Sequence, residues 1–161
     1  MADAKALYQE VILDHNRKPR NYGELEHPSH HAEGVNPLCG DHITMGLDIA
    51  GETIARIAFH GDSCAICKAS ASMMSATVKG KTVSESETLI REFLDMATGK
   101  RELDQLPHIG RLAVFAGVRE LPMRVKCAIL PWHTLQAAFN SVASVSTETD
   151  ADPMRTPIGN A

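Results

Sequence analysis

The sequence has no long hydrophobic run and no excess of basic residues, and these two absences exclude whole classes of protein. Its apolar runs are only a few residues long, whereas a membrane-spanning helix needs about 20. The polar start, residues 1–5, lacks the apolar core of a secretory signal peptide. A formal net charge of −4 does not favour binding to the phosphate backbone of nucleic acids, which depends on clusters of Lys and Arg. We therefore expect a cytoplasmic protein that binds neither membranes nor nucleic acid.

The chain also has no need of disulfide bonds and shows no internal repeat. Its 161 residues suit one domain, with ordinary shares of hydrophobic (43%) and charged (22%) residues, so a hydrophobic core suffices for stability. There are four cysteines. In a protein without a secretory signal, thiols stay reduced, which favours metal binding or catalysis over disulfides.

Hydrophobic alternation predicts a β-hairpin in the first half of the chain. Apolar residues alternate with polar or small ones over residues 43–49 and again over 55–59, and Gly51-Glu52 supplies the turn. A weaker pattern over residues 31–35 predicts a short strand at the edge of the sheet.

Helical spacing of apolar residues accounts for most of the remaining domain. Ser84 and Glu87 form a possible capping box at the start of one helix, and Pro131 is expected to kink or restart another. Because strands are followed by helices, we expect an α+β fold with helices on one face of a small antiparallel β-sheet. Helices are expected over residues 3–15, 65–79, 84–98, about 111–115 and 124–139.

The composition changes near residue 140. From there the chain is rich in Ser, Thr, Asp, Glu and Pro, with few large apolar residues. Such a segment cannot bury enough apolar surface to offset the entropy of ordering. We therefore expect one domain over residues 1–139 and a disordered tail over 140–161.

Three cysteines lie where the predicted fold would bring them together. Cys39 precedes the hairpin, Cys64 follows it, and Cys127 is expected at the start of the last helix. A turn before one strand and a loop after its antiparallel neighbour lie side by side, which also brings in Asp41. Three thiolates and one carboxylate match the four ligands of Zn²⁺. Because a carboxylate is unusual in a structural zinc site, Asp41 suggests that ligands exchange during function.

Two other interpretations are open from the residues alone. Cys39, Cys64 and Cys127 would also suit a hydrophobic core, since free cysteine is often buried, and spacing does not decide between core and metal. Cys64-Ala65-Ile66-Cys67 is a lone CxxC, which on a thioredoxin-like fold would be a redox pair, although the βαβ pattern is missing. Cys67 then remains a candidate resolving thiol or spare ligand.

Six segments of the chain carry a family resemblance. Together they resemble the SufU branch of the iron–sulfur assembly proteins, a family related to IscU and to the N-terminal part of NifU, and the likeness covers about residues 5–139. The segments are residues 11–15, 19–21, 36–41, 61–66, 69–74 and 124–128.

The resemblance implies an IscU-like fold and a zinc-dependent sulfurtransferase. Such a carrier would accept persulfide sulfur from a SufS-type cysteine desulfurase and serve downstream SUF cluster-assembly proteins. Position by position, the implied zinc ligands are Cys39, Asp41, Cys64 and Cys127, with Cys39 as the sulfur acceptor. We also take Arg124, close to Cys127 in the sequence, as a candidate partner-binding residue.

The main alternative is a scaffold that holds iron or a [2Fe–2S] cluster on the same ligands. Scaffolds of the IscU type have a His directly before the last ligand cysteine, whereas this chain has Lys126. Residues 100–122 also resemble the insertion typical of SufU, and both features favour the carrier. A third interpretation is a zinc-stabilised interaction module without transfer chemistry. Cys67 departs from the family pattern.

Overall fold

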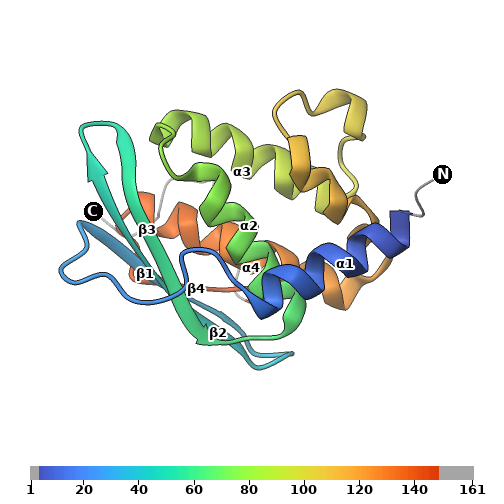
Figure 1. The fold of residues 1–161 in the computed structure, drawn as a ribbon, viewed down its shortest axis with the longest axis horizontal. Helices are drawn as coiled ribbons and strands as arrows, with labels where there is room; N and C mark the ends of the chain where they lie inside the picture. Colours follow the sequence, from blue (N-terminus) through green and yellow to red (C-terminus); the bar gives the residue numbers. More distant parts are fainter. Residues whose placement is uncertain (1–3, 149–161) are drawn as a thin grey trace.

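The protein is described here by a computed structural model that places residues 4–148. Its centre is a sheet of strand order β3-β2-β1-β4 (Figure 1). The first three strands, β1 (His30–Asn36), β2 (Asp41–Ala50) and β3 (Thr53–Asp62), pair antiparallel, which confirms the predicted hairpin. The fourth, β4 (Ser144–Ser146), pairs with β1 in parallel, so the sheet is mixed.

The strand β4 corrects two expectations. It lies within residues 140–161, where disorder was expected, and it gives β1 a neighbour on each side, so β1 is not an edge strand. The pairing relies on backbone groups, which residues of any side chain possess: Glu33 N–H donates to Ala143 O, and Thr147 N–H donates to Val35 O. Hydrophobic pattern alone therefore misses it. Residues 149–161 lie outside the described residues.

The helices gather on one side of the sheet (Figure 1), which confirms the expected α+β architecture. In the described residues they are α1 (Ala4–Arg17), α2 (Ala65–Val78), α3 (Val83–Thr98) and α4 (Pro122–Phe139), with short 3-10 helices η1 (Leu103–Gln105) and η2 (Gly110–Glu120).

Three predicted helix details differ from the structure in their bounds or residues. The capping box of α3 is formed by Thr82 and Glu85, because Ser84 and Glu87 already lie inside the helix. The helix expected near residues 111–115 is part of the longer η2. The last helix begins at Pro122, a favoured first helical residue, so Cys127 lies in its second turn.

The aromatic core fixes α4 against its neighbours. The Trp132 ring stacks on Phe93 of α3, with ring centroids 4.4 Å apart. Its Nε1–H donates to Ser70 Oγ of α2 at 3.0 Å, and Ser70 in turn donates to the carbonyl of Ala128 at 2.6 Å. Because Ala128 follows Cys127, this packing also holds Cys127 in place.

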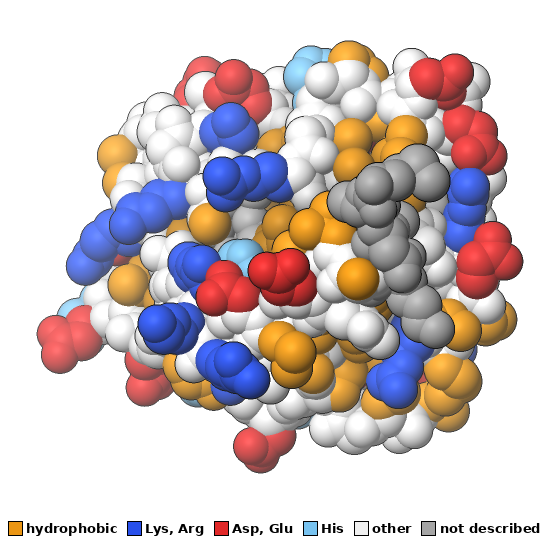
Figure 2. All heavy atoms as spheres, turned by 45° about the vertical axis from the view of Figure 1, so that its right-hand side comes forward, with side chains coloured by type: hydrophobic (Ala, Val, Ile, Leu, Met, Phe, Trp, Pro, Cys, Tyr) orange, Lys and Arg blue, Asp and Glu red, His pale blue; other side chains and the backbone are white. Residues whose placement is uncertain are grey.

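The surface charges are unevenly spread. On the face shown in Figure 2, Lys and Arg side chains gather on one half, with hydrophobic side chains exposed between them. The net charge of −4 therefore does not describe this face. No helix within the described part of the chain has the length and apolar character to cross a bilayer.

Candidate metal centre

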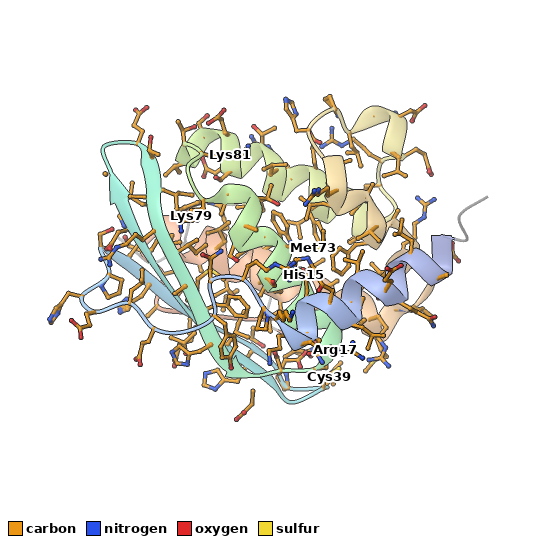
Figure 3. The ribbon with its side chains drawn as sticks, viewed as in Figure 1. His15, Arg17, Cys39, Met73, Lys79 and Lys81 are labelled. Carbon is orange, nitrogen blue, oxygen red and sulfur yellow. The ribbon has the colours of Figure 1, made fainter. Side chains whose placement is uncertain are left out.

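Cys39 lies in the tight turn between β1 and β2. The backbone carbonyl of Asn36 accepts hydrogen bonds from Cys39 N–H at 3.2 Å and Gly40 N–H at 2.9 Å. Gly40 has φ +75°, which a side chain would disfavour. Cys39 is exposed, and Figure 3 places it at the lower rim of the molecule. The turn thus holds Cys39 at the surface.

Asp41 and Cys64 are joined across the ends of β2 and β3. The Asp41 side chain is 2% exposed, and its Oδ1 accepts a hydrogen bond from Cys64 N–H at 2.8 Å. Its other oxygen, Oδ2, lies 3.9 Å from Cys64 Sγ. Cys64 is itself the N-cap of α2, where its sulfur accepts from Cys67 N–H. The hairpin therefore brings Asp41 and Cys64 together, as the sequence predicted.

Cys127 approaches from α4 and is buried. Its Sγ lies 3.4 Å from Cys39 Sγ, and it donates to the carbonyl of Met123 at 3.5 Å. The ligand atoms of Cys39, Asp41 and Cys127 all lie within 4.8 Å of one another. Two distant stretches of sequence, the turn of Cys39 and Asp41 and the start of α4, thus converge at one end of the sheet, and Asp41 also contacts Cys64.

The donors at this end of the sheet suit a zinc ion. Two thiolates bound to tetrahedral zinc lie about 3.8 Å apart, given Zn–S bonds of about 2.3 Å, and the Cys39–Cys127 pair at 3.4 Å is close to that separation. Cys64 Sγ lies 3.9 Å from Asp41 Oδ2, but it falls outside the group of three ligand atoms that lie within 4.8 Å of one another, so its place as the fourth ligand stays a prediction. A mixed set of soft sulfur and hard oxygen is compatible with zinc and also with iron. That these four residues bind a metal stays a prediction.

The thiols of Cys64 and Cys127 have unequal acidities. Mainly through its hydrogen bond with Cys127, the pKa of Cys64 falls to about 7. The pKa of Cys127 is raised by that same hydrogen bond, by burial and by its hydrogen bond with Cys39. Without a metal ion, Cys64 is therefore the first of this pair to ionise. Cys64 would be a thiolate, the form that metals bind, near neutral pH.

Cys67 lies apart from these donors. Its side chain is fully buried among core residues, and it is not part of the group of side chains that could hold a metal. The structure records Cys64 and Cys67 as free thiols. Burial raises the pKa of the Cys67 thiol, and the negative charges of Asp41 and Cys64 raise it further. Cys67 is thus poorly suited to be a reactive thiol.

In the native, metal-free protein, Cys67 is expected to resist alkylation at pH 8 under conditions that modify Cys39 completely. The raised pKa leaves little thiolate on Cys67, and burial keeps the reagent away. Peptide mass mapping after timed iodoacetamide treatment measures both rates, and unfolding in urea should abolish the difference. Equal labelling in the native protein would contradict the assignment of Cys67 to the core.

Arg124 and Tyr8 lie at the edge of the centre. Arg124 is exposed on the first turn of α4, as a partner-binding residue would need to be. The buried hydroxyl of Tyr8 has no hydrogen-bond partner in the described structure. Burial raises its pKa most strongly. The charge of Arg124 lowers this pKa, and charges on Cys64 and Cys127 raise it. No sequence motif singles out Tyr8.

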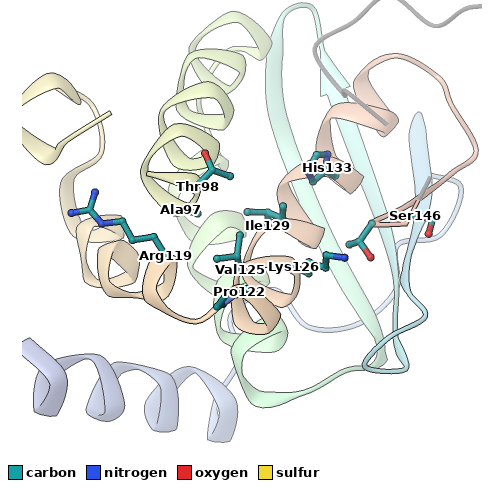
Figure 4. Close-up of a pocket in the computed structure, with 10 residues that line it drawn as sticks. Ala97, Thr98, Arg119, Pro122, Val125, Lys126, Ile129, His133 and Ser146 are labelled. Carbon is teal, nitrogen blue, oxygen red and sulfur yellow. The ribbon is translucent and has the colours of Figure 1, made fainter. Parts of the chain in front are cut away.

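A separate pocket lies on another side of α4. It has a volume of about 370 Å³, and Arg119, Lys126 and His133 are among the residues that line it (Figure 4). Within the described residues, its lining includes none of the candidate ligands. Lys126, the residue before Cys127, forms an ion pair with Glu148 at 2.6 Å. The Lys126 ammonium group is therefore paired with a carboxylate and does not act as a metal ligand.

Comparison with known proteins identifies relatives over most of the chain. The sequence profile of the NifU-like N-terminal domain matches residues 7–128. The zinc-dependent sulfurtransferase SufU of Bacillus subtilis is 38% identical over 84% of this chain and 90% of its own length. The iron–sulfur cluster assembly scaffold protein IscU of Streptococcus pyogenes is 35% identical over 89% of each chain.

A solved structure agrees in fold. The crystal structure of a candidate iron–sulfur cluster assembly scaffold protein for the SUF system, from Fervidobacterium islandicum, superposes with a TM-score of 0.77. It is 34% identical and covers 84% of this chain and 98% of that protein. Of these three proteins, one sequence relative is thus named as a sulfurtransferase, and the other sequence relative and the structural relative are named as scaffolds.

Proposed function

Because the chain belongs to the NifU-like N-terminal domain family, we propose that it is a zinc-dependent sulfurtransferase for iron–sulfur cluster assembly. It accepts persulfide sulfur on Cys39 from a SufS-type cysteine desulfurase and passes it to downstream SUF assembly proteins. The assembly role follows the Streptococcus pyogenes relative and the Fervidobacterium islandicum structure, both of which are named for iron–sulfur cluster assembly. The sulfurtransferase role follows the Bacillus subtilis relative.

One observation carries the proposal: Cys39 is exposed, whereas the other proposed metal ligands are buried or half-buried. Asp41 and Cys127 are buried, and Cys64 is half-buried. A sulfur acceptor must meet the persulfide of another protein, so its thiol has to be accessible. Cys39 is the member of the set that meets this need.

Exposed apolar side chains near Cys39 support a protein partner. Leu38, directly before Cys39, is 53% exposed, and Met123, whose carbonyl contacts Cys127, is 51% exposed. Leu121 at the start of α4 is similarly exposed. Apolar residues with a neighbouring Arg, here Arg124, are typical of the core of a protein interface.

The chemistry is a sulfur exchange without net oxidation. The Cys39 thiolate attacks the terminal sulfur of the partner's persulfide, and a bond forms between these two sulfur atoms. The bond between the terminal sulfur and the partner's cysteine breaks, and its electron pair leaves with that cysteine as a thiolate. Bound zinc would keep the coordinating cysteines deprotonated at neutral pH. Asp41 and the buried Cys127 hold the site together while Cys39 reacts.

The second candidate is a cluster scaffold on the same residues. It is favoured by the identity of 35% to a relative named as a scaffold, and three thiolates with a carboxylate would also suit iron. Lys126 counts against it, because scaffolds of the IscU type have a histidine directly before the last ligand cysteine, where this chain has a lysine. We therefore prefer the carrier.

The deciding experiment is desulfurase turnover measured with wild-type protein and with Cys39→Ser, alongside metal analysis of both. The wild type is expected to accelerate turnover and to carry a sulfur atom on Cys39, detected by mass spectrometry. Cys39→Ser should reduce turnover to the level of the desulfurase alone. Cys67→Ala, which changes a buried thiol outside the donor set, is the matched control and should remain active.

Two results would count against the proposal, the first against the acceptor residue and the second against the sulfurtransferase itself. Full acceleration by Cys39→Ser would remove Cys39 as the acceptor. No acceleration by the wild type, together with a stable iron–sulfur chromophore after anaerobic reconstitution, would support the scaffold.

A further inference from the structure

Asn36, the last residue of β1, is a fully buried polar residue. It contacts the turn that carries Cys39 and the helix α4 that carries Cys127. Its backbone carbonyl closes the Cys39 turn by accepting from Cys39 N–H and Gly40 N–H. Its side-chain Nδ2 lies 3.7 Å from Cys127 Sγ. One residue therefore supports Cys39 through its backbone and Cys127 through its side chain.

The orientation of the Asn36 amide follows from its other neighbours. Oδ1 accepts from the backbone N–H of Leu38 at 3.3 Å and from Thr147 Oγ1 at 3.1 Å. A backbone N–H can only donate, so the atom that faces Leu38 must be the oxygen. The NH₂ group is thereby directed at Cys127, and the contact is an N–H···S hydrogen bond.

The segment after α4 maintains this orientation. Val35 and Ser146 are paired residues of β1 and β4, and Thr147 N–H continues the pairing by donating to Val35 O at 3.0 Å. This pairing places the Thr147 hydroxyl on Asn36 Oδ1. The segment that was expected to be disordered thus positions the amide that contacts Cys127.

The hydrogen bond affects only one of two adjacent sulfur atoms. Cys39 and Cys127 are 3.4 Å apart, yet the described hydrogen bonds of the Asn36 side chain reach Cys127, Leu38 and Thr147. Donation to a thiolate withdraws negative charge from the sulfur and makes it a weaker nucleophile, as outer-shell hydrogen bonds do in metal sites.

We propose that Asn36 is a positioning residue that makes the two neighbouring thiols unequal: its amide keeps Cys127 as a retained, weakly nucleophilic ligand. Cys39, exposed and without this amide, is left as the thiol that reacts. The assignment of Cys39 rests on the proposed function, whereas the effect on Cys127 is measurable without it.

The test compares wild-type protein with Asn36→Asp after loading with Co²⁺. Aspartate has nearly the shape of asparagine and keeps an oxygen for Leu38 and Thr147, but it has no N–H for Cys127. Loss of that hydrogen bond makes the sulfur a stronger donor, so the thiolate-to-cobalt absorption band should move to lower energy. Removal of the metal by a chelator should show an affinity about 10- to 100-fold weaker.

Thr147→Val is the second variant, because it leaves the amide and the charge of the site unchanged. It removes only the hydroxyl that holds Oδ1 and should shift the same band in the same direction, by less. The cysteine that carries sulfur after incubation with a desulfurase is then mapped by mass spectrometry. Sulfur is expected on Cys39, the exposed thiol of the pair, because the buried Cys127 lies out of reach of a partner's persulfide.

The outcomes separate this proposal from the proposed function. An unshifted cobalt band in both variants would overturn the role of Asn36, and if Asn36→Asp does not fold, an unshifted band in Thr147→Val alone would do so. A shifted band without sulfur on any cysteine would instead uphold Asn36 and reject the sulfurtransferase.

Discussion

Asp41→Ala is expected to bind zinc at least about 100-fold more weakly than the wild type. The substitution removes the carboxylate donor of the proposed site and, at the same time, the acceptor of the Cys64 N–H. The N-terminal end of α2 then loses the contact that holds Cys64 beside the hairpin. Competition with a chromophoric chelator measures the change in affinity.

Asp41→Asn separates the two roles of the carboxylate. The amide oxygen can still accept from Cys64 N–H, but the negative charge is gone. If Asp41 is a ligand, Asp41→Asn should lose most of the affinity as well, while the melting temperature of its metal-free form stays close to that of the metal-free wild type. Wild-type affinity in Asp41→Ala would mean that Asp41 only supports the loop and that the donor set is wrong.

Gly61→Ala is expected to destabilise the protein by about 4 kcal/mol, from backbone strain together with overpacking. Gly61 has φ +137°, and a Cβ built there would overlap the carbonyl oxygen of His42 on the paired strand β2. The strand end would have to move away from β2. Urea denaturation monitored by circular dichroism gives the change in free energy of unfolding.

Gly51→Ala is the matched control for this substitution. Gly51 also has positive φ, but no atom lies within 4 Å of the position where its Cβ would be. It should therefore cost only about 1–2 kcal/mol, the penalty of the left-handed backbone. Equal losses for the two variants would mean that close packing at Gly61 is not the cause. Because Cys64 follows β3 by two residues, Gly61→Ala should also weaken metal binding.

Local patterns predicted the hairpin and most helices because these elements depend on neighbouring residues. The alternation over residues 43–49 and 55–59 reflects burial on one face, and it led to β2 and β3. The same hairpin argument placed Asp41 near Cys64, and the two are in contact. In these cases, the pattern of side chains along the sequence is enough to predict the backbone structure.

The elements that were missed depend on backbone groups or on distant partners. β4 is a strand because β1 offers unpaired backbone groups, which its sequence Ser-Val-Ser does not reveal. Asn36 appeared only as part of a family segment, and its contacts come from residues 91 and 111 positions away. The burial of Cys67 required the packing of the whole core. Such contacts follow from the complete fold rather than from spacing.

The pairing of β4 with β1 has a consequence for self-association. Without β4, the outer side of β1 would present a row of unsatisfied N–H and C=O groups, which can template the addition of a strand from another molecule. Only three residues of β4 pair with it, but they cover the stretch of β1 that leads into Asn36. The short, mostly polar β4 thus covers this edge of β1, which disfavours pairing with a strand of another molecule.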